Sequence, residues 1–196
     1  MDLSIYHSLN NFAYEHAWVG DLAKFFAQYA VFIPVAVVAV IWLAGPGRFE
    51  RALRQAAFAA GIATILALLI VKIINELYDR TRPFVHHAHH LLIAHGKDAS
   101  FPSDHTSGAF AIAFTLLLFG RRSLGWAAFI FGVLIGVARV MVGVHYPTDV
   151  LGGVLVGAIA ALIVWAPPVR GRLCRVSDRL SDLLPGRTPS PRATSS

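Results

Sequence analysis

Five apolar segments recur along this chain of 196 residues, and they constrain its fold more than any other feature. They lie near residues 21–43, 56–77, 105–120, 124–144 and 148–166. A helix needs roughly 20 apolar residues to cross a bilayer, and all but the third segment approach or reach this length. Hydrophobic residues make up 56% of the chain and charged residues 14%, whereas soluble domains average roughly 45–50% and 25%. We therefore predict an all-α integral membrane protein, a bundle of about five transmembrane helices.

The two ends of the chain differ from this apolar middle. Residues 1–16 carry apolar side chains at the spacing of a short amphipathic helix, which we expect to lie on the bilayer surface. The start lacks the basic segment and cleavage site of a signal peptide, so we expect it to belong to the mature protein. We expect residues 1–168 to form a single transmembrane domain and residues 169–196 a basic, largely disordered cytoplasmic tail.

The arginines indicate which side of the membrane each end faces. The net charge of +6 comes largely from arginines that flank the apolar segments, and such clusters face the cytoplasm. With five crossings, the clusters after the first and third segments share the cytoplasmic side with the tail. The N-terminus, the loop 80–101 and the turn 145–149 then lie outside. No basic stripe with interleaved aromatic residues appears, so nothing indicates nucleic-acid binding.

The stretch from Arg139 to Asp149 places an arginine, a histidine and an aspartate at the end of an apolar run. Pro147 suits the first position of a helix, so His145 is expected just ahead of that helix and Asp149 in its first turn. A carboxylate beside an imidazole is the usual arrangement of an activated histidine. The alternative is structural: His145 would cap a turn and Asp149 would complement the helix dipole. This stretch alone leaves both interpretations open.

Two further polar segments are expected on the same outer face. Arg82-Pro83 follows the second apolar segment, and Pro-Ser-Asp-His at 102–105 opens the third, with Ser100 as a candidate N-cap and Pro102 as the first helical residue. Two arginines, a serine and the free N–H groups of a helix N-terminus suit a phosphoryl group. Of the two histidines, one can attack phosphorus while the other protonates the departing oxygen.

Together these segments resemble the three-part signature of the type-2 phosphatidic acid phosphatase superfamily. The signature comprises Arg82-Pro83, then Pro-Ser-Asp-His at 102–105, then Arg139 followed by His145 and Asp149. Within this superfamily the chain looks most like the undecaprenyl-diphosphatase branch associated with bacitracin resistance, whose members share the Pro-Ser-Asp-His form and the run HYPTDVLGG. The resemblance covers about residues 77–153.

The resemblance implies a role for each matching residue. His145 would be the nucleophile that forms a phosphohistidine, with Asp149 orienting it and His105 protonating the leaving lipid phosphate. The side chains of Arg82, Ser103 and Arg139 would bind the phosphoryl oxygens. The backbone N–H groups of Asp104 and His105 would also bind them. The family needs no metal and no other cofactor, so we expect none.

The first part of the signature departs from the family. Relatives usually have a lysine six intervening residues before the Arg-Pro pair, and this chain has Asn75 there. Lys72 lies about one turn earlier on the same face and Arg80 lies nearby, so either is a candidate for the missing charge. Asp104 stands where many relatives have glycine, which matches the diphosphatase branch, and Ala138 replaces a serine.

The outer loop contains a cluster of histidines that suggests a second site. The cluster comprises His86, His87, His89, His90 and His95. Imidazole is the commonest metal ligand, so a non-enzymatic metal-binding membrane protein is the alternative of another class. Cys174 is the only cysteine, which excludes an internal disulfide and a cysteine-based metal site. The cluster also suits a cation-rich rim that attracts a diphosphate, and the sequence leaves its role open.

The resemblance implies an enzyme that hydrolyses undecaprenyl diphosphate to undecaprenyl phosphate and phosphate and so recycles the lipid carrier of cell-wall precursors. We expect it in the plasma membrane of a bacterium, with the N-terminus and active site outside and the C-terminus in the cytoplasm. Its expected partners are a polyisoprenoid diphosphate lipid and the bilayer. The nearest alternative substrate is another lipid phosphate, such as phosphatidate or phosphatidylglycerophosphate. The sequence does not indicate the oligomeric state.

Overall fold

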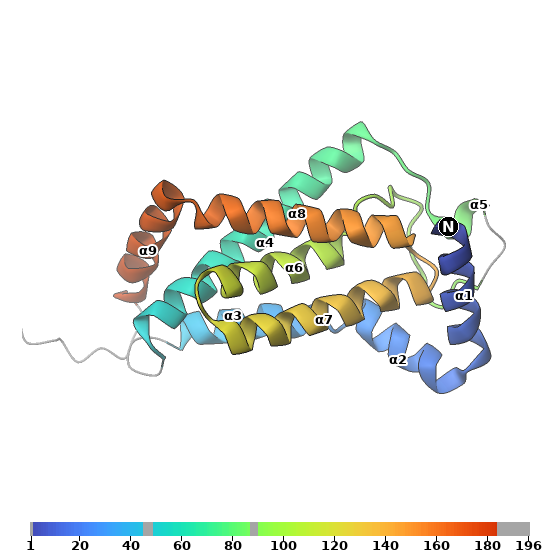
Figure 1. Cartoon of the computed structure of the whole chain (residues 1–196), viewed down its shortest axis with the longest axis horizontal. Coiled ribbons are helices and arrows are strands. Elements are labelled where there is room, and N and C mark those ends of the chain that lie inside the picture. The colour runs from blue at the N-terminus through green and yellow to red at the C-terminus, as the bar shows by residue number, and fades with distance from the viewer. Residues whose placement is uncertain (1, 45–48, 87–89, 184–196) are drawn as a thin grey trace, which may run out of the picture.

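The computed structural model of the protein describes residues 2–44, 49–86 and 90–183, and these ranges contain helices and no β-strand. The helices are α1 (Asp2–Glu15), α2 (Ala17–Gln28), α3 (Phe32–Leu43), α4 (Arg51–Leu77), α5 (Pro83–His86), α6 (Asp104–Leu118), α7 (Arg122–Met141), α8 (Pro147–Trp165) and α9 (Pro167–Ser181). Figure 1 shows α6 near the middle of a bundle that also contains α3, α4, α7 and α8.

The centre of the bundle is built from small side chains. Ten of the 15 residues of α6 are buried, and most are alanine, glycine, serine or threonine. α4 presents Ala56, Ala60, Ala63 and Ala67, all at most 2% exposed, at helical spacing. Small residues allow helix backbones to approach closely, which is how helices associate where lipid removes the hydrophobic driving force between them. Close packing of these small side chains therefore fixes the position of α6 in the bundle.

The outer surface carries the large apolar side chains. On α8, Leu151 is 66% exposed and Leu155 is 61% exposed, and Ile130 on α7 is 58% exposed. A soluble monomer rarely exposes contiguous apolar surface of this kind, because such surface favours contact with lipid over water. The apolar exterior around a core of small residues is the pattern of a membrane protein, and the predicted all-α membrane fold is confirmed.

The predicted membrane segments correspond to helices with shifted ends. α4, α7 and α8 are long and apolar enough to cross a bilayer, and α2 with α3 forms a fourth such unit that bends by 42° at its break. The bend lies at residues 29–31. Pro34, the only proline of that segment, does not form the bend, because it already lies inside the first turn of α3. The remaining predicted segment, the third, is α6, which at 15 residues is shorter than α4, α7 and α8 and is packed among them.

The basic tail differs from its prediction. The sequence predicts a largely disordered segment over 169–196, and this is wrong for its first part because α9 is a helix. Ser177 accepts a hydrogen bond from Trp42 Nε1 at 3.1 Å, and Asp178 accepts from Gln55 Nε2 at 3.0 Å and pairs with Arg51. These contacts hold one polar face of α9 against α3 and α4. Residues 184–196 lie outside the described residues.

The N-terminal helix covers one end of the bundle. α1 buries Tyr6, Asn10 and Ala13. The Asn10 side chain donates to the backbone carbonyls of His90 and Met141, both at 2.8 Å, and accepts from the His90 N–H at 3.1 Å. α1 therefore holds the loop before α6 against the end of α7. That α1 lies on the bilayer surface stays a prediction.

Close packing of α8 on α6 yields a stability prediction. A Cβ atom on Gly157 would lie 2.8 Å from the backbone of both Ser107 and Ala111. Because backbone atoms cannot move aside as a side-chain tip can, we expect Gly157→Ala to destabilise the protein by about 1–3 kcal/mol. The midpoint of thermal unfolding in detergent measures the change. Gly61→Ala on α4 is the matched control, since its Cβ meets nothing within 4 Å, and an equal loss in both variants would contradict the packing argument.

Candidate active site

His145 lies in the turn between α7 and α8 and is 1% exposed. As the sequence predicts, it comes just before α8, whose N-cap is Tyr146 and whose first residue is Pro147. Gly143 turns the chain after α7 with φ of 92°, where a side chain would also meet a backbone carbonyl at 2.7 Å. The imidazole Nδ1 lies 2.8 Å from the Ser100 carbonyl oxygen. Because a carbonyl only accepts, Nδ1 carries the proton and Nε2 presents its lone pair.

Two buried arginines point at this lone pair. Arg82 Nη1 lies 3.3 Å and Arg139 Nη2 lies 3.1 Å from His145 Nε2. Arg82 comes from the segment that leads into α5, and Arg139 from the last turn of α7. One lone pair cannot accept two strong hydrogen bonds, so both N–H groups are available to the oxygens of a phosphoryl group on Nε2.

Burial lowers the pKa of His145 to about 4. The neighbouring Asp149 acts in the opposite direction, while the positive charges of Arg139 and Arg82 lower the pKa further. The imidazole is therefore neutral at pH 7. A neutral Nε2 keeps the lone pair that nucleophilic attack on phosphorus requires.

Asp149 lies behind His145 and has other partners at shorter distances. Its Oδ2 accepts from the Tyr146 N–H at 2.8 Å and lies 3.5 Å from His145 Nδ1, while its Oδ1 accepts from Arg80 Nη1 at 2.7 Å. The Ser100 carbonyl, at 2.8 Å, is the nearer partner of Nδ1. The orienting role of Asp149 stays a prediction, and the structure adds the Ser100 carbonyl as a second orienting group.

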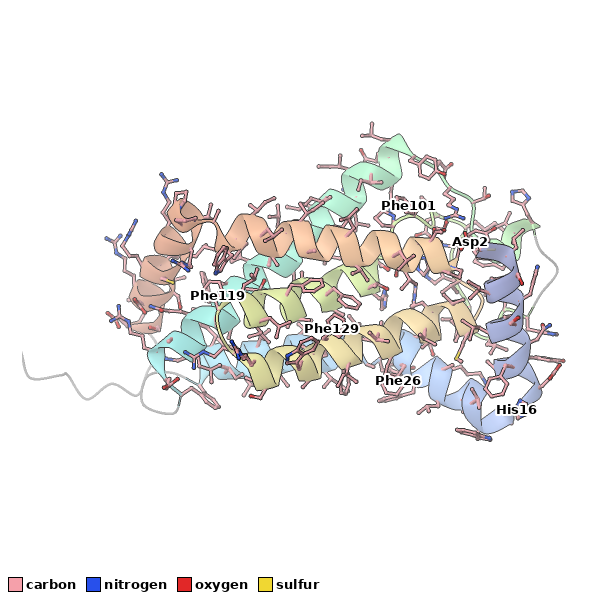
Figure 2. All side chains as sticks on the ribbon, viewed as in Figure 1. Asp2, His16, Phe26, Phe101, Phe119 and Phe129 are labelled. Carbon is pink, nitrogen blue, oxygen red and sulfur yellow. The ribbon has the colours of Figure 1, made fainter. Side chains whose placement is uncertain are left out.

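Arg80 connects Asp149 to the N-terminal helix. Its Nη2 donates to Asp2 Oδ2 at 2.8 Å, and its guanidinium lies 4.2 Å from the centre of the Tyr146 ring. Asp2 also accepts from the Thr148 hydroxyl at 2.6 Å and from the Thr148 N–H at 3.1 Å. Figure 2 shows Asp2 at the start of α1, near the beginning of α8. The charge of Arg80 is thus directed to two carboxylates rather than toward His145 Nε2.

His105 is the second residue of α6, and its orientation is set by its neighbour. His105 Nδ1 donates to Asp104 Oδ1 at 2.9 Å, and the same oxygen lies 3.9 Å from Arg139 Nη2. The second histidine is thereby brought to the same end of the bundle as the first. With Nδ1 bonded, Nε2 is the nitrogen that can exchange a proton with a substrate. The His105 N–H, a predicted phosphate donor, is already bonded to Asp104 Oδ1 at 2.7 Å.

Ser103, rather than Ser100, is the N-cap of α6, so the predicted start at Pro102 is wrong by two residues. The Ser103 hydroxyl is fully buried and accepts from the Thr106 hydroxyl at 3.0 Å. Its own O–H proton can still be donated. Ser100 is unsuited to the cap because its carbonyl faces His145. Phosphate binding by Ser103 stays a prediction.

The other first-signature candidates lie apart from the imidazole. With its amide oriented to donate, Asn75 bonds the Phe101 carbonyl at 2.6 Å and the Val71 carbonyl at 3.3 Å. It thus holds the loop that precedes α6. Lys72 is exposed on α4 and, among the described residues, makes no hydrogen bond or ion pair with the site. Neither residue is placed to supply the charge of the family lysine to a group on His145.

Two residues that the sequence did not assign to the site lie within it. His95 Nε2 accepts from Arg139 Nη2 at 3.1 Å, and the Asp98 carboxylate pairs with Arg82 Nη2 at 3.1 Å. Both come from the histidine-rich loop. The only sequence signal for them is their polarity at a spacing of three residues just before α6, which is too weak to select them from the rest of the loop.

The remaining histidines of the loop do not gather around one point. His90 stacks on Tyr14 with ring centroids 3.3 Å apart, and His86 is exposed. His87 and His89 lie outside the described residues. Within the described parts of the chain, no group of three or more His, Cys, Asp or Glu side chains is placed to hold a metal ion. The metal-binding alternative therefore finds no support in these parts.

Comparison with known proteins assigns the family. Residues 56–170 match the PAP2 superfamily. The chain belongs to this superfamily. PAP2 stands for the type-2 phosphatidic acid phosphatases, and the match contains all three parts of the signature described in the sequence, and therefore both histidines and both arginines described above.

Two curated relatives illustrate the branch of the PAP2 superfamily. The chain is 38% identical over 163 residues to undecaprenyl-diphosphatase BcrC of Bacillus subtilis (strain 168), covering 83% of this chain and 82% of the relative. It is 31% identical over 170 residues to a protein of Bacillus licheniformis named bacitracin transport permease protein BcrC, covering 86% and 81%. The predicted resemblance to this branch is confirmed.

A solved structure has a similar fold. Crystalline LpxE of Aquifex aeolicus is similar with a TM-score of 0.63 and 24% sequence identity, over 83% of this chain and 93% of that one. At this identity the likeness concerns the fold alone. It agrees with the helical membrane bundle described above.

Proposed function

We propose that this PAP2 protein hydrolyses undecaprenyl diphosphate to undecaprenyl phosphate and phosphate. The observation that carries the proposal is the convergence of Arg82 Nη1 and Arg139 Nη2 on the lone pair of His145 Nε2. This geometry provides a nucleophile and two cationic donors for one phosphoryl group. The choice of lipid is supported by the 38% identity to a relative named undecaprenyl-diphosphatase.

The first chemical step transfers the terminal phosphoryl group to His145. Nε2 attacks phosphorus, and the bond from phosphorus to the bridging oxygen breaks with its electron pair remaining on that oxygen. His105 Nε2 gives a proton to the departing lipid phosphate. The phosphorylated imidazole gains a positive charge, which the Ser100 carbonyl at 2.8 Å and the Asp149 carboxylate at 3.5 Å stabilise.

The second step returns the enzyme to its starting state. A water molecule attacks the phosphohistidine and transfers a proton to His105, which the first step left neutral. The bond between Nε2 and phosphorus breaks, and its electron pair returns to Nε2 as phosphate leaves. Throughout both steps the two arginines neutralise the oxygens of the transferred group from fixed, buried positions. This chemistry needs no metal ion, which stays a prediction.

The proposed site faces outward. α1, the start of α6 and the start of α8 share one end of the bundle in Figure 1, while α9 and the α6–α7 turn lie at the other. Arg51, Arg121 and Arg170 belong to that other end, and arginines near helix ends favour the cytoplasmic side. An outward site would receive the diphosphate on the side where cell-wall precursors are consumed.

The direct test is phosphate release by the purified protein in detergent, with a metal chelator present. We expect release from undecaprenyl diphosphate that the chelator leaves unchanged. Phosphatidate and phosphatidylglycerophosphate, tested in parallel at equal concentration, should release phosphate at least about tenfold more slowly, a difference in activation free energy of about 1.4 kcal/mol. Faster release from either lipid would overturn the proposed substrate, and loss of activity with chelator would overturn the metal-independent mechanism.

A further inference from the structure

A line of polar contacts joins the two phosphate-facing arginines through one loop. Arg139 Nη2 donates to His95 Nε2 at 3.1 Å, and His95 Nδ1 lies 3.6 Å from Asp98 Oδ1. The same Asp98 oxygen accepts from Arg82 Nε at 3.3 Å. We call His95 and Asp98 the arginine bridge. Neither residue belongs to the three-part signature.

Asp98 fixes the orientation of Arg82. Its carboxylate accepts from Nε at 3.3 Å and from Nη2 at 3.1 Å, a two-point contact that fixes the guanidinium plane. The backbone carbonyls of Asp98 and Ala99 accept from the same two nitrogens, Nε and Nη2 respectively, at 3.1 Å each. Only Nη1, on the opposite side, faces His145 Nε2, and it also donates to the Val144 carbonyl at 3.0 Å. The position of Asp98 therefore determines where Nη1 points.

Arg139 has fewer fixed contacts, so His95 matters more to it. Its Nη1 donates to the Ala27 carbonyl at 3.2 Å, and its Nε is buried with no hydrogen-bond partner among the described residues. Its Nη2 is shared between His95 and His145, both at 3.1 Å. Burial, followed by the charge of Arg82, lowers the pKa of His95. His95 is therefore neutral at pH 7 and accepts this hydrogen bond.

The loop that carries the bridge is fixed at both ends. Ile93 is 8% exposed and belongs to a buried cluster with Val142 and Val144, next to the catalytic turn. Ser100 is fully buried, and its N–H donates to the Arg80 carbonyl at 2.8 Å. The short segment between them has little freedom, although the Asp98 side chain is 64% exposed. The exposed position makes it possible to change Asp98 without opening the core.

We propose that the arginine bridge sets the relative position of Arg82 and Arg139 and so shapes the phosphate-binding site. His95 and Asp98 are positioning residues: each acts on a phosphoryl group through the arginine that it holds. The inference rests on the proposed function, because it assumes that the two arginines bind phosphoryl oxygens. Catalysis by fixed charges depends on geometry held before the substrate arrives, so misplaced arginines lose binding and rate together.

The first test concerns the hydrogen bond to Arg139. We expect His95→Leu to weaken binding of inorganic phosphate about tenfold, measured by isothermal titration of the purified protein in detergent. His95→Gln keeps an acceptor oxygen, so we expect its affinity to lie within about twofold of wild type. His86→Leu, the same change at the exposed last residue of α5, should bind phosphate like wild type. Equal affinities in the two His95 variants would overturn the bridge.

The second test concerns the charge on Arg82. Asp98→Asn replaces one acceptor by an N–H₂ group that faces the guanidinium, and we expect phosphate to bind about tenfold more weakly. Asp21→Asn removes the same charge from an exposed residue on α2 that pairs with Lys24, and should leave phosphate affinity unchanged. Tighter binding by Asp98→Asn would overturn the proposal, because it would show a carboxylate that competes with the anion for Arg82.

Two further outcomes separate this proposal from the proposed function. If wild type bound no phosphate, the arginines would not form an anion site, and the bridge would be overturned with it. If the His95 and Asp98 variants behaved as expected but no undecaprenyl diphosphate were hydrolysed, the substrate would be wrong and the bridge would stand. Unfolding midpoints of all variants identify any that lose binding through loss of structure, and a loss of affinity explained wholly by unfolding would also overturn the bridge.

Discussion

His145→Ala is expected to lower phosphate release from undecaprenyl diphosphate by about 10⁴-fold or more, the scale at which removal of a nucleophile acts. The variant keeps Arg82 and Arg139, so phosphate binding should survive in part while the covalent step is lost. The comparison uses initial rates of wild type and variant at saturating lipid. A rate within tenfold of wild type would exclude His145 as the nucleophile.

The covalent intermediate provides independent support. With substrate labelled in the terminal phosphoryl group, rapid quenching in base should trap label on wild-type protein and none on His145→Ala. A bond between nitrogen and phosphorus breaks in acid and survives base, so acid treatment should release the label. His86→Ala is the matched control, because His86 is exposed and is not among the described hydrogen-bond or ion-pair partners of Arg82 and Arg139. Label that resists acid would indicate a different intermediate.

His105→Asn is expected to lower the rate with undecaprenyl diphosphate by about 10²–10⁴-fold, because general acid catalysis contributes that much when the leaving group is a poor one. An aryl phosphate such as p-nitrophenyl phosphate releases a leaving group that needs no proton. With this probe we expect the variant to lose less than about tenfold in its phosphorylation step. Measuring both substrates on both proteins gives the ratio that tests the role.

The ratio distinguishes a proton donor from a residue that only maintains the site. If Asp104 and His105 acted solely by positioning Arg139, to which Asp104 lies at 3.9 Å, both substrates would lose the same factor. An equal loss would therefore exclude His105 as the general acid. Single-turnover measurement is required, since the second step uses the same residue as a base and could otherwise mask the difference.

The sequence predicts the helical fold and the main site residues because both leave local signals. Long apolar segments have few structural solutions in a bilayer, so the helices follow from composition and length. Pro147 and Asp149 give the start of α8 directly, which places His145 just before it. The break between α2 and α3 has no such local signal. Pro34 lies after the break, and the three residues of the bend include neither proline nor glycine.

What the sequence does not reveal are contacts made through the backbone or between distant residues. The acceptor of His145 Nδ1 at 2.8 Å is the carbonyl of Ser100, and any residue type could supply a carbonyl. His95 and Asp98 meet the arginines only because the loop is fixed at Ile93 and Ser100, a tertiary constraint. The composition of the tail, basic and then rich in Pro, Ser and Thr, predicts disorder, whereas α9 forms because α3 and α4 offer partners for its polar face.

The contacts of Asp2 with Thr148 and Arg80 also bear on how the protein is made. Asp2 is synthesised long before Thr148, its partner at the start of α8. Asp2 therefore cannot bind Thr148 until α8 has been synthesised and inserted. The active site is completed only after α8 has been inserted, so a chain arrested before α8 has no assembled catalytic centre.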